Sequence, residues 1–199
     1  IVPGAAALDT INANHSLVPL GFRRPGKVDV PCRQDLEEAA GMVGLDFVVD
    51  LVLCRDEQIA RALAGDPQRV FLEGVALARQ LYEVACPGPV DIALTSAYPY
   101  DIDLYQAVRA VEYADAVVRE GGSILLVAAC PEGIGEEEFR RLMMETKQPE
   151  DFLRDVARRN GKVTFGVLGY ALARIRAEKR LAILCDGIPA PALEAMGLR

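Results

Sequence analysis

The sequence has a single histidine, His15, among its 199 residues, and it has no tryptophan. Any Ser-His-Asp or Cys-His catalytic group must therefore use His15, and this chain alone holds no multi-histidine metal site. The five cysteines are scattered without a CxxC pair, which makes a zinc ribbon a poor interpretation. An odd, dispersed set of cysteines is typical of reduced thiols, and we expect a cytoplasmic protein.

Basic patches and long apolar runs are also lacking. The net charge is −7 and the sequence pI is about 4.9, so we expect no nucleic-acid partner and no electrostatic attachment to a membrane. No apolar run approaches the roughly 20 residues that span a bilayer. Neither a P-loop nor a GxGxxG fingerprint occurs. With 51% hydrophobic and 26% charged residues, the chain has the composition of an ordinary globular protein.

Regular elements are sparse at the start of the chain and alternate later. Up to residue 86 the patterns predict a short helix near Ala7–Asn14, a helix at Gln34–Val43, a strand at Phe47–Leu53, and a helix from Asp66-Pro67 to about Glu83. The Cys86-Pro-Gly-Pro89 sequence breaks the chain. This break divides it into residues 1–86 and 87–199.

The second part alternates apolar strand-length runs with helical patterns. Predicted strands are Val90–Ser96, Ser123–Cys130, Lys162–Val167 and Arg180–Cys185; predicted helices are Ile102–Arg119 with Asp101 as its cap, two starting near Gly135 and Pro149, and Gly169–Ala177. Near-continuous apolar strands between helices indicate an α/β fold. Its sheet is mostly parallel and has helices on both faces.

Ligands of such sheets bind where strand ends lead into helices. Tyr105, Gln106 and Arg109 fall within roughly 100° of each other on one face of the predicted helix Ile102–Arg119, which follows the strand Val90–Ser96. An arginine, an amide and a phenol together are suited to hold a small carboxylate. The alternative is a solvated Tyr105–Arg109 pair. For His15 the alternatives are a metal ligand and a hydrogen-bonded structural residue.

The segment Ile1–Leu17, which contains Asn14-His15-Ser16, resembles the segment that follows a Gly-Gly-Arg-Lys motif in the nickel-dependent lactate racemase family. The remaining resemblance is carried in order by Gly44–Leu53, Ala64–Asp66, Tyr98–Ala110 and Gly121–Gly133. The His15 segment and the Tyr98-Pro…Leu-Tyr-Gln106 segment are the most specific.

The resemblance implies an enzyme that interconverts stereoisomers of a 2-hydroxy acid by reversible hydride transfer to a nickel-pincer nucleotide. It implies that His15 is the nickel and cofactor ligand and that Tyr105, Gln106 and Arg109 lie near substrate or cofactor. It also implies that residues 1–86 are the end of the amino-terminal, cofactor-bearing α/β domain, and that residues 87–199 are a Rossmann-like carboxy-terminal domain.

The chain departs from the family pattern in three ways. The lysine that tethers the cofactor and the two acid/base histidines are expected upstream of Ile1, so we expect this chain alone to be inactive. The missing amino-terminal half is then its partner. Lactate racemases also have a different lysine at the position that Arg109 occupies in this chain. Because arginine is larger and forked, the resemblance does not identify which hydroxy acid is bound. The alternative is a non-catalytic α/β binding or interaction module.

Overall fold

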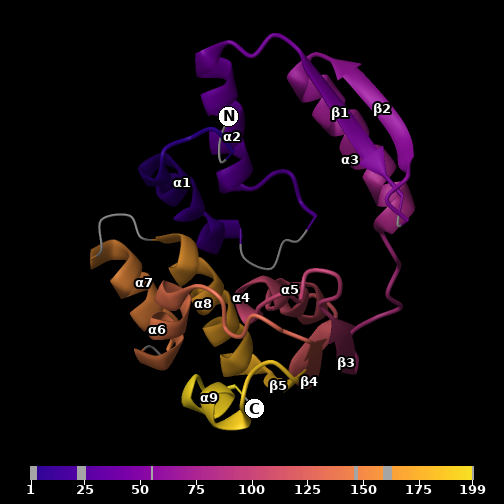
Figure 1. Cartoon of the computed structure of the whole chain (residues 1–199). Coiled ribbons are helices and arrows are strands. Elements are labelled where there is room, and N and C mark those ends of the chain that lie inside the picture. Colours follow the sequence, from indigo (N-terminus) through magenta and orange to yellow (C-terminus); the bar gives the residue numbers. More distant parts are fainter. Residues whose placement is uncertain (1–3, 22–25, 55, 146–147, 159–162, 199) are drawn as a thin grey trace.

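A computed structural model describes residues 4–21, 26–54, 56–145, 148–158 and 163–198. The first part contains the helix α1 (Leu8–His15), a 3-10 turn η1 (Val18–Gly21) and the helix α2 (Pro31–Val43). The strands β1 (Val48–Leu53) and β2 (Ile59–Gly65) then form an antiparallel pair, and α3 (Pro67–Tyr82) packs against it. In Figure 1 this hairpin and α3 stand apart from the second sheet, at the other end of the molecule.

The second part is an α/β unit built on a three-stranded parallel sheet of order β3-β4-β5. Its strands are β3 (Val90–Ser96), β4 (Val118–Ala128) and β5 (Arg180–Cys185). Its helices are α4 (Leu104–Ala107), α5 (Arg109–Asp115), α6 (Glu137–Glu145), α7 (Pro149–Arg158), α8 (Val163–Glu178) and α9 (Ala190–Ala195). The predicted α/β class and parallel sheet flanked by helices are confirmed. Helices were expected on both faces of the sheet, but among the described residues α5 and α8 pack on one face and large apolar side chains of the other face are exposed.

The main core lies between this sheet and the helices α5 and α8, which pack on one face of it. Ile124 and Leu126 of β4 are fully buried there against Val111 of α5 and Ile175 of α8. Along the strands the alternate side chains point the other way. Ile92, Leu94 and Leu184 on that opposite face are exposed.

The loops that follow β3, β4 and β5 are joined to one another by backbone hydrogen bonds beside α4. The amide of Leu104 donates to the carbonyl of Gly133, and the amide of Gly187 donates to the carbonyl of Ala129. A Cβ at position 187 would lie 1.7 Å from the carbonyl oxygen of Cys130, so only glycine fits this approach. These bonds fix the start of α4 relative to the sheet.

Two sequence predictions are wrong in the second part. The predicted strand Lys162–Val167 is helical from Val163 onward, as the first turn of α8, and Lys162 lies outside the described residues. The predicted helix Ile102–Arg119 is two short helices, and the chain is already in β4 at Val118.

The predicted cap of that helix also differs. Asp103 accepts a hydrogen bond from the amide of Gln106 at 2.7 Å and so caps α4. Asp101 instead accepts from the amide of Ala129 at 2.8 Å and ties the loop after β3 to the end of β4. In the first part, the strand β2 was not predicted at all. None of the helices in the described ranges is both long and apolar enough to cross a lipid bilayer.

Candidate functional site: a cavity between α1, α5 and α8

A cavity of about 330 Å³ lies where α1 and η1 meet α4, α5 and α8. It is lined by His15, Tyr105, Arg109 and Glu112, and by the apolar side chains of Val18, Val167 and Leu168 together with Tyr113. We call it the His15 cavity. Figure 1 shows α1 above α8, with α4 and α5 to the right of α8, so segments distant in the sequence converge here.

His15 is the last residue of α1, and its ring orientation is set by its own helix. Its Nδ1 lies 2.8 Å from the carbonyl oxygen of Ile11, one turn earlier. A carbonyl only accepts hydrogen bonds, so in the neutral ring Nδ1 carries the proton and Nε2 keeps a free lone pair. The neighbouring Asn14 is buried and its amide donates to the Cys32 carbonyl and to the Asp35 carboxylate, each at 2.8 Å, which anchors α1 to α2.

Tyr105 forms the floor of the cavity. Its ring packs edge-on against Phe139 and Phe165, with centroids 5.4 and 5.5 Å away. Burial raises the pKa of the phenol, and the positive charge of Arg109 partly opposes this shift. Tyr105 therefore keeps its proton at neutral pH.

Arg109 is the cation of the cavity. Its guanidinium carbon lies 5.4 Å from the centroid of the Tyr105 ring, and its Nη1 donates to the side-chain oxygen of Gln106. Burial raises the pKa of Glu112, one turn further along α5, while the charge of Arg109 lowers it and that of Asp115 raises it. Arg109 therefore stands between a neutral amide and a partly desolvated carboxyl group.

Gln106 faces a second cavity of about 440 Å³ on the other side of Arg109. Tyr98, Tyr100 and Tyr113 line it together with Ala107 and Ala110; we call it the tyrosine cavity. The structure thus places His15, Tyr105 and Arg109 around one cavity and Gln106 in its neighbour, with Arg109 and Tyr113 in the walls of both.

Sequence reasoning did not single out Glu112 and Tyr113. Their spacing of three and four residues from Arg109 was the available signal, because it places them on the same helical face. Among the described residues, no three His, Cys, Asp or Glu side chains gather into a metal-binding cluster. His15 is accordingly a single imidazole donor, which fits a metal whose other ligands come from a cofactor.

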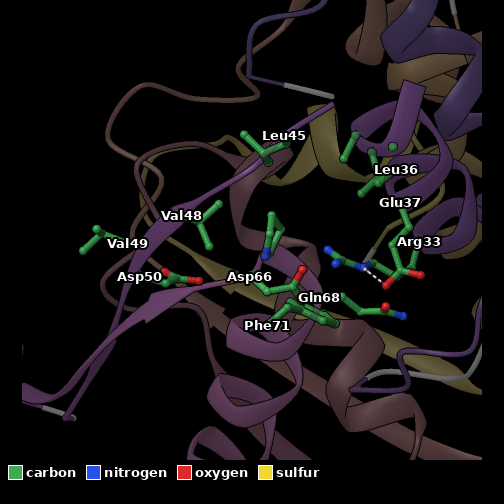
Figure 2. Close-up of a pocket in the computed structure, with 13 residues that line it drawn as sticks. Arg33, Leu36, Glu37, Leu45, Val48, Val49, Asp50, Asp66, Gln68 and Phe71 are labelled. Atoms are coloured by element: carbon green, nitrogen blue, oxygen red, sulfur yellow. Dashed lines mark hydrogen bonds and ion pairs between the residues drawn. The ribbon is translucent and has the colours of Figure 1, made fainter. Parts of the chain in front are cut away.

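A larger cavity of about 600 Å³ lies between α2, β1 and α3 (Figure 2). Its charged side chains already have partners. Arg33 pairs with Glu37 at 3.1 Å and lies over the Phe71 ring, 3.4 Å from its centroid. Asp66 accepts from the amide of Arg69 as the cap of α3, and Asp50 accepts from the amide of Leu51. These contacts account for the charges without a ligand, so we assign the candidate site to the His15 cavity.

Comparison with known proteins gives consistent results. The family profile described as the lactate racemase C-terminal domain matches residues 85–199. The lactate racemase of Thermoanaerobacterium thermosaccharolyticum is 30% identical over 193 residues, covering 94% of this chain and 45% of that protein. The lactate racemase of Lactiplantibacillus plantarum is 32% identical over 157 residues, covering 77% of this chain and 37% of that protein.

The structural comparison covers the whole chain. The apoprotein structure of the lactate racemase from T. thermosaccharolyticum superposes with a TM-score of 0.90 at 28% sequence identity, over 100% of this chain and 49% of that one. The chain therefore spans about half the length of the relatives it matches.

Proposed function

Because this chain belongs to the lactate racemase family, we propose that it is part of an enzyme that interconverts stereoisomers of a 2-hydroxy acid. The observation that carries the proposal is the His15 cavity. His15 and the pair Tyr105 and Arg109 are separated by 90 residues or more in sequence, yet they line one space. A side chain suited to bind a metal thus faces the same space as one suited to bind a carboxylate.

We further propose that the cavity takes the family's nickel-pincer nucleotide, with His15 as the protein ligand of the nickel. The free Nε2 lone pair supports this, since a neutral imidazole is a suitable donor for nickel. The cofactor, when bound, would accept and return the hydride of the substrate carbon. The Nδ1–H bond to Ile11 would hold the imidazole in the ligating tautomer.

The remaining side chains are suited to hold the substrate. Arg109 is the group we assign to the substrate carboxylate, because a guanidinium pairs with carboxylates through two hydrogen bonds. Gln106 orients it by accepting from Nη1, and the protonated Tyr105 offers a hydroxyl donor beside it. Fixed orientation matters in a racemisation, because the planar intermediate must stay in place while either face is attacked.

The domain assignment follows the same proposal. Residues 1–86 would complete the cofactor-bearing domain, and residues 87–199 would form the Rossmann-like domain around the parallel sheet. The family's acid/base histidines are not supplied by this chain, whose one histidine is His15. All five cysteines are free thiols, which supports a reducing compartment such as the cytoplasm.

The test uses the full-length gene product, co-expressed with enzymes that synthesise the pincer cofactor. We expect an intact-mass increment for a lysine-tethered nucleotide, stoichiometric nickel, and racemisation of at least one 2-hydroxy acid. Arg109→Ala should weaken hydroxy-acid binding by about 10- to 100-fold, as expected for a lost charged hydrogen bond. Arg119→Ala, which removes an exposed arginine on β4, is the matched control.

Two results would contradict the proposal. An unmodified mass without nickel, under conditions where a relative is loaded, favours the non-catalytic binding module. If the wild type and Arg109→Ala bind the hydroxy acid equally well, Arg109 is not the residue that binds the substrate carboxylate.

A further inference from the structure

The His15 cavity and the tyrosine cavity are neighbours that share a wall. Arg109 and Tyr113 line both of them, and Gln106, the hydrogen-bond partner of Arg109, lines the second. A carboxylate held by Arg109 therefore lies at the boundary between them. The rest of a substrate molecule bound in this way could extend into the tyrosine cavity, which has a volume of about 440 Å³.

The lining of the tyrosine cavity indicates what that space can hold. Tyr98, Tyr100 and Tyr113 are 80%, 75% and 69% exposed, an unusual group of uncovered aromatic rings. Ala107 and Ala110 supply a small apolar floor between them. Apart from Arg109, the described residues that line the cavity carry no charged side chain. A second carboxylate or a phosphate would find no cation there, whereas an apolar ring would find aromatic neighbours.

We propose, as an extension of the proposed function, that the substrate is a 2-hydroxy acid with an apolar ring on its side chain. The ring lies in the tyrosine cavity while Arg109 binds the carboxylate. Lactate, whose side chain is one methyl group, leaves this cavity empty. Apolar surface buried against tyrosine rings stabilises the larger acid by a contribution that lactate lacks.

The experiment compares 3-phenyllactate with lactate on the cofactor-loaded, full-length gene product. We expect kcat/KM for 3-phenyllactate to exceed that for lactate by at least about ten-fold, the discrimination typical of extra apolar groups in a pocket. Calorimetry on the cofactor-free protein should give the same order of affinities, independently of turnover.

A variant that fills the cavity tests the location. Ala110→Phe places a ring on the floor of the tyrosine cavity, and we expect it to reduce the phenyllactate-to-lactate ratio of kcat/KM by at least about ten-fold. Ala116→Phe is the matched control, because Ala116 is exposed at the end of α5 outside this cavity. It should leave the ratio unchanged.

The outcomes separate the two proposals. Efficient racemisation of lactate, with no preference for phenyllactate and no effect of Ala110→Phe on the ratio, overturns this inference and leaves the proposed function standing. Failure of every 2-hydroxy acid with nickel-loaded protein overturns the proposed function itself. If another part of the longer protein fills the cavity, Ala110→Phe lowers the unfolding temperature of the ligand-free protein and slows both substrates equally, which also overturns the inference.

Discussion

His15 Nδ1 lies 2.8 Å from the carbonyl oxygen of Ile11, so the helix α1 itself selects the tautomer with a free Nε2. We predict that His15→Ala lowers the nickel content of the full-length protein by at least about ten-fold, because the protein's own ligand is lost. Elemental analysis of the purified protein measures this directly.

Ser16→Ala is the control for this variant. The Ser16 hydroxyl donates to the carbonyl of Ala13 at the same helix end and lies outside the cavity lining. Its loss tests whether fraying of α1 alone releases nickel. Equal nickel in His15→Ala and wild type would show that His15 is not the ligand.

A buried ion pair joins the ends of α5 and α8. The Lys179 ammonium donates to the Asp115 carbonyl at 2.6 Å and also to its carboxylate, and the two side chains are 5% and 2% exposed. We predict that Lys179→Met destabilises the protein by about 3–5 kcal/mol, because it removes the ammonium group that neutralises the buried Asp115 carboxylate. Urea unfolding of the full-length protein is the measurement.

An exposed pair of similar length provides the comparison. The Arg119 Nε lies 2.6 Å from the Asp91 Oδ1, and the two side chains are 54% and 77% exposed. Removing it with Arg119→Ala should cost less than about 1 kcal/mol. A Lys179→Met effect as small as that of Arg119→Ala would refute the buried-charge argument.

The buried Cys130 thiol makes stability depend on pH in the alkaline range. Burial and the neighbouring Cys185 raise its pKa from 9.0 to about 12. Between these values the folded state keeps a proton that the unfolded chain has lost, so stability falls as pH rises from about 9 to 12. We predict that Cys130→Ala removes up to about one proton of this linkage. Unfolding temperatures measured across pH 8.5 to 11 test it.

The slope against pH, rather than the stability at one pH, is the readout, because Cys130→Ala also removes packing from the core. Cys86 is exposed, so Cys86→Ala should keep the wild-type slope. Identical slopes in all three proteins would contradict the prediction.

Local sequence patterns were sufficient to predict the bounds of elements that carry a single strong pattern. The strands Val90–Ser96 and Arg180–Cys185 have the predicted bounds, because short apolar runs between breakers leave little choice. The helix after Asp66-Pro67 also begins as predicted, since the Asp66 side chain accepts from the amide of Arg69.

Elements whose type depends on tertiary contacts were not predictable. The segment from Val163 contains valine, threonine and phenylalanine at strand-like spacing, yet it continues into α8, whose residues from Val167 to Ile175 are mostly buried. A helix buried nearly all round reads as an apolar run and loses its 3.6-residue period. The strand β2 was missed because its Ala-rich sequence has weak strand propensity, and its pairing with β1 supplies what the sequence lacks.

The candidate site shows the same division. Helical spacing placed Tyr105, Gln106 and Arg109 near one another, and in the structure Arg109 donates a hydrogen bond to Gln106. Spacing did not reveal that Gln106 and Tyr105 face different cavities on the two sides of Arg109. The approach of His15 to Arg109 depends on α1 packing against α8, which no local pattern records.

The uncovered face of the parallel sheet governs how residues 1–199 behave when produced alone. Ile92, Leu94 and Leu184 expose a hydrocarbon surface on the two edge strands β3 and β5. Unpaired strand edges together with exposed apolar side chains favour association with further strands and apolar partners. In a substitution scan of the isolated chain, polar residues at these positions would therefore increase solubility. Substitutions tolerated at Ile92, Leu94 and Leu184 in such a scan would reflect reduced aggregation of the isolated chain. They would not show which side chains the folded core needs.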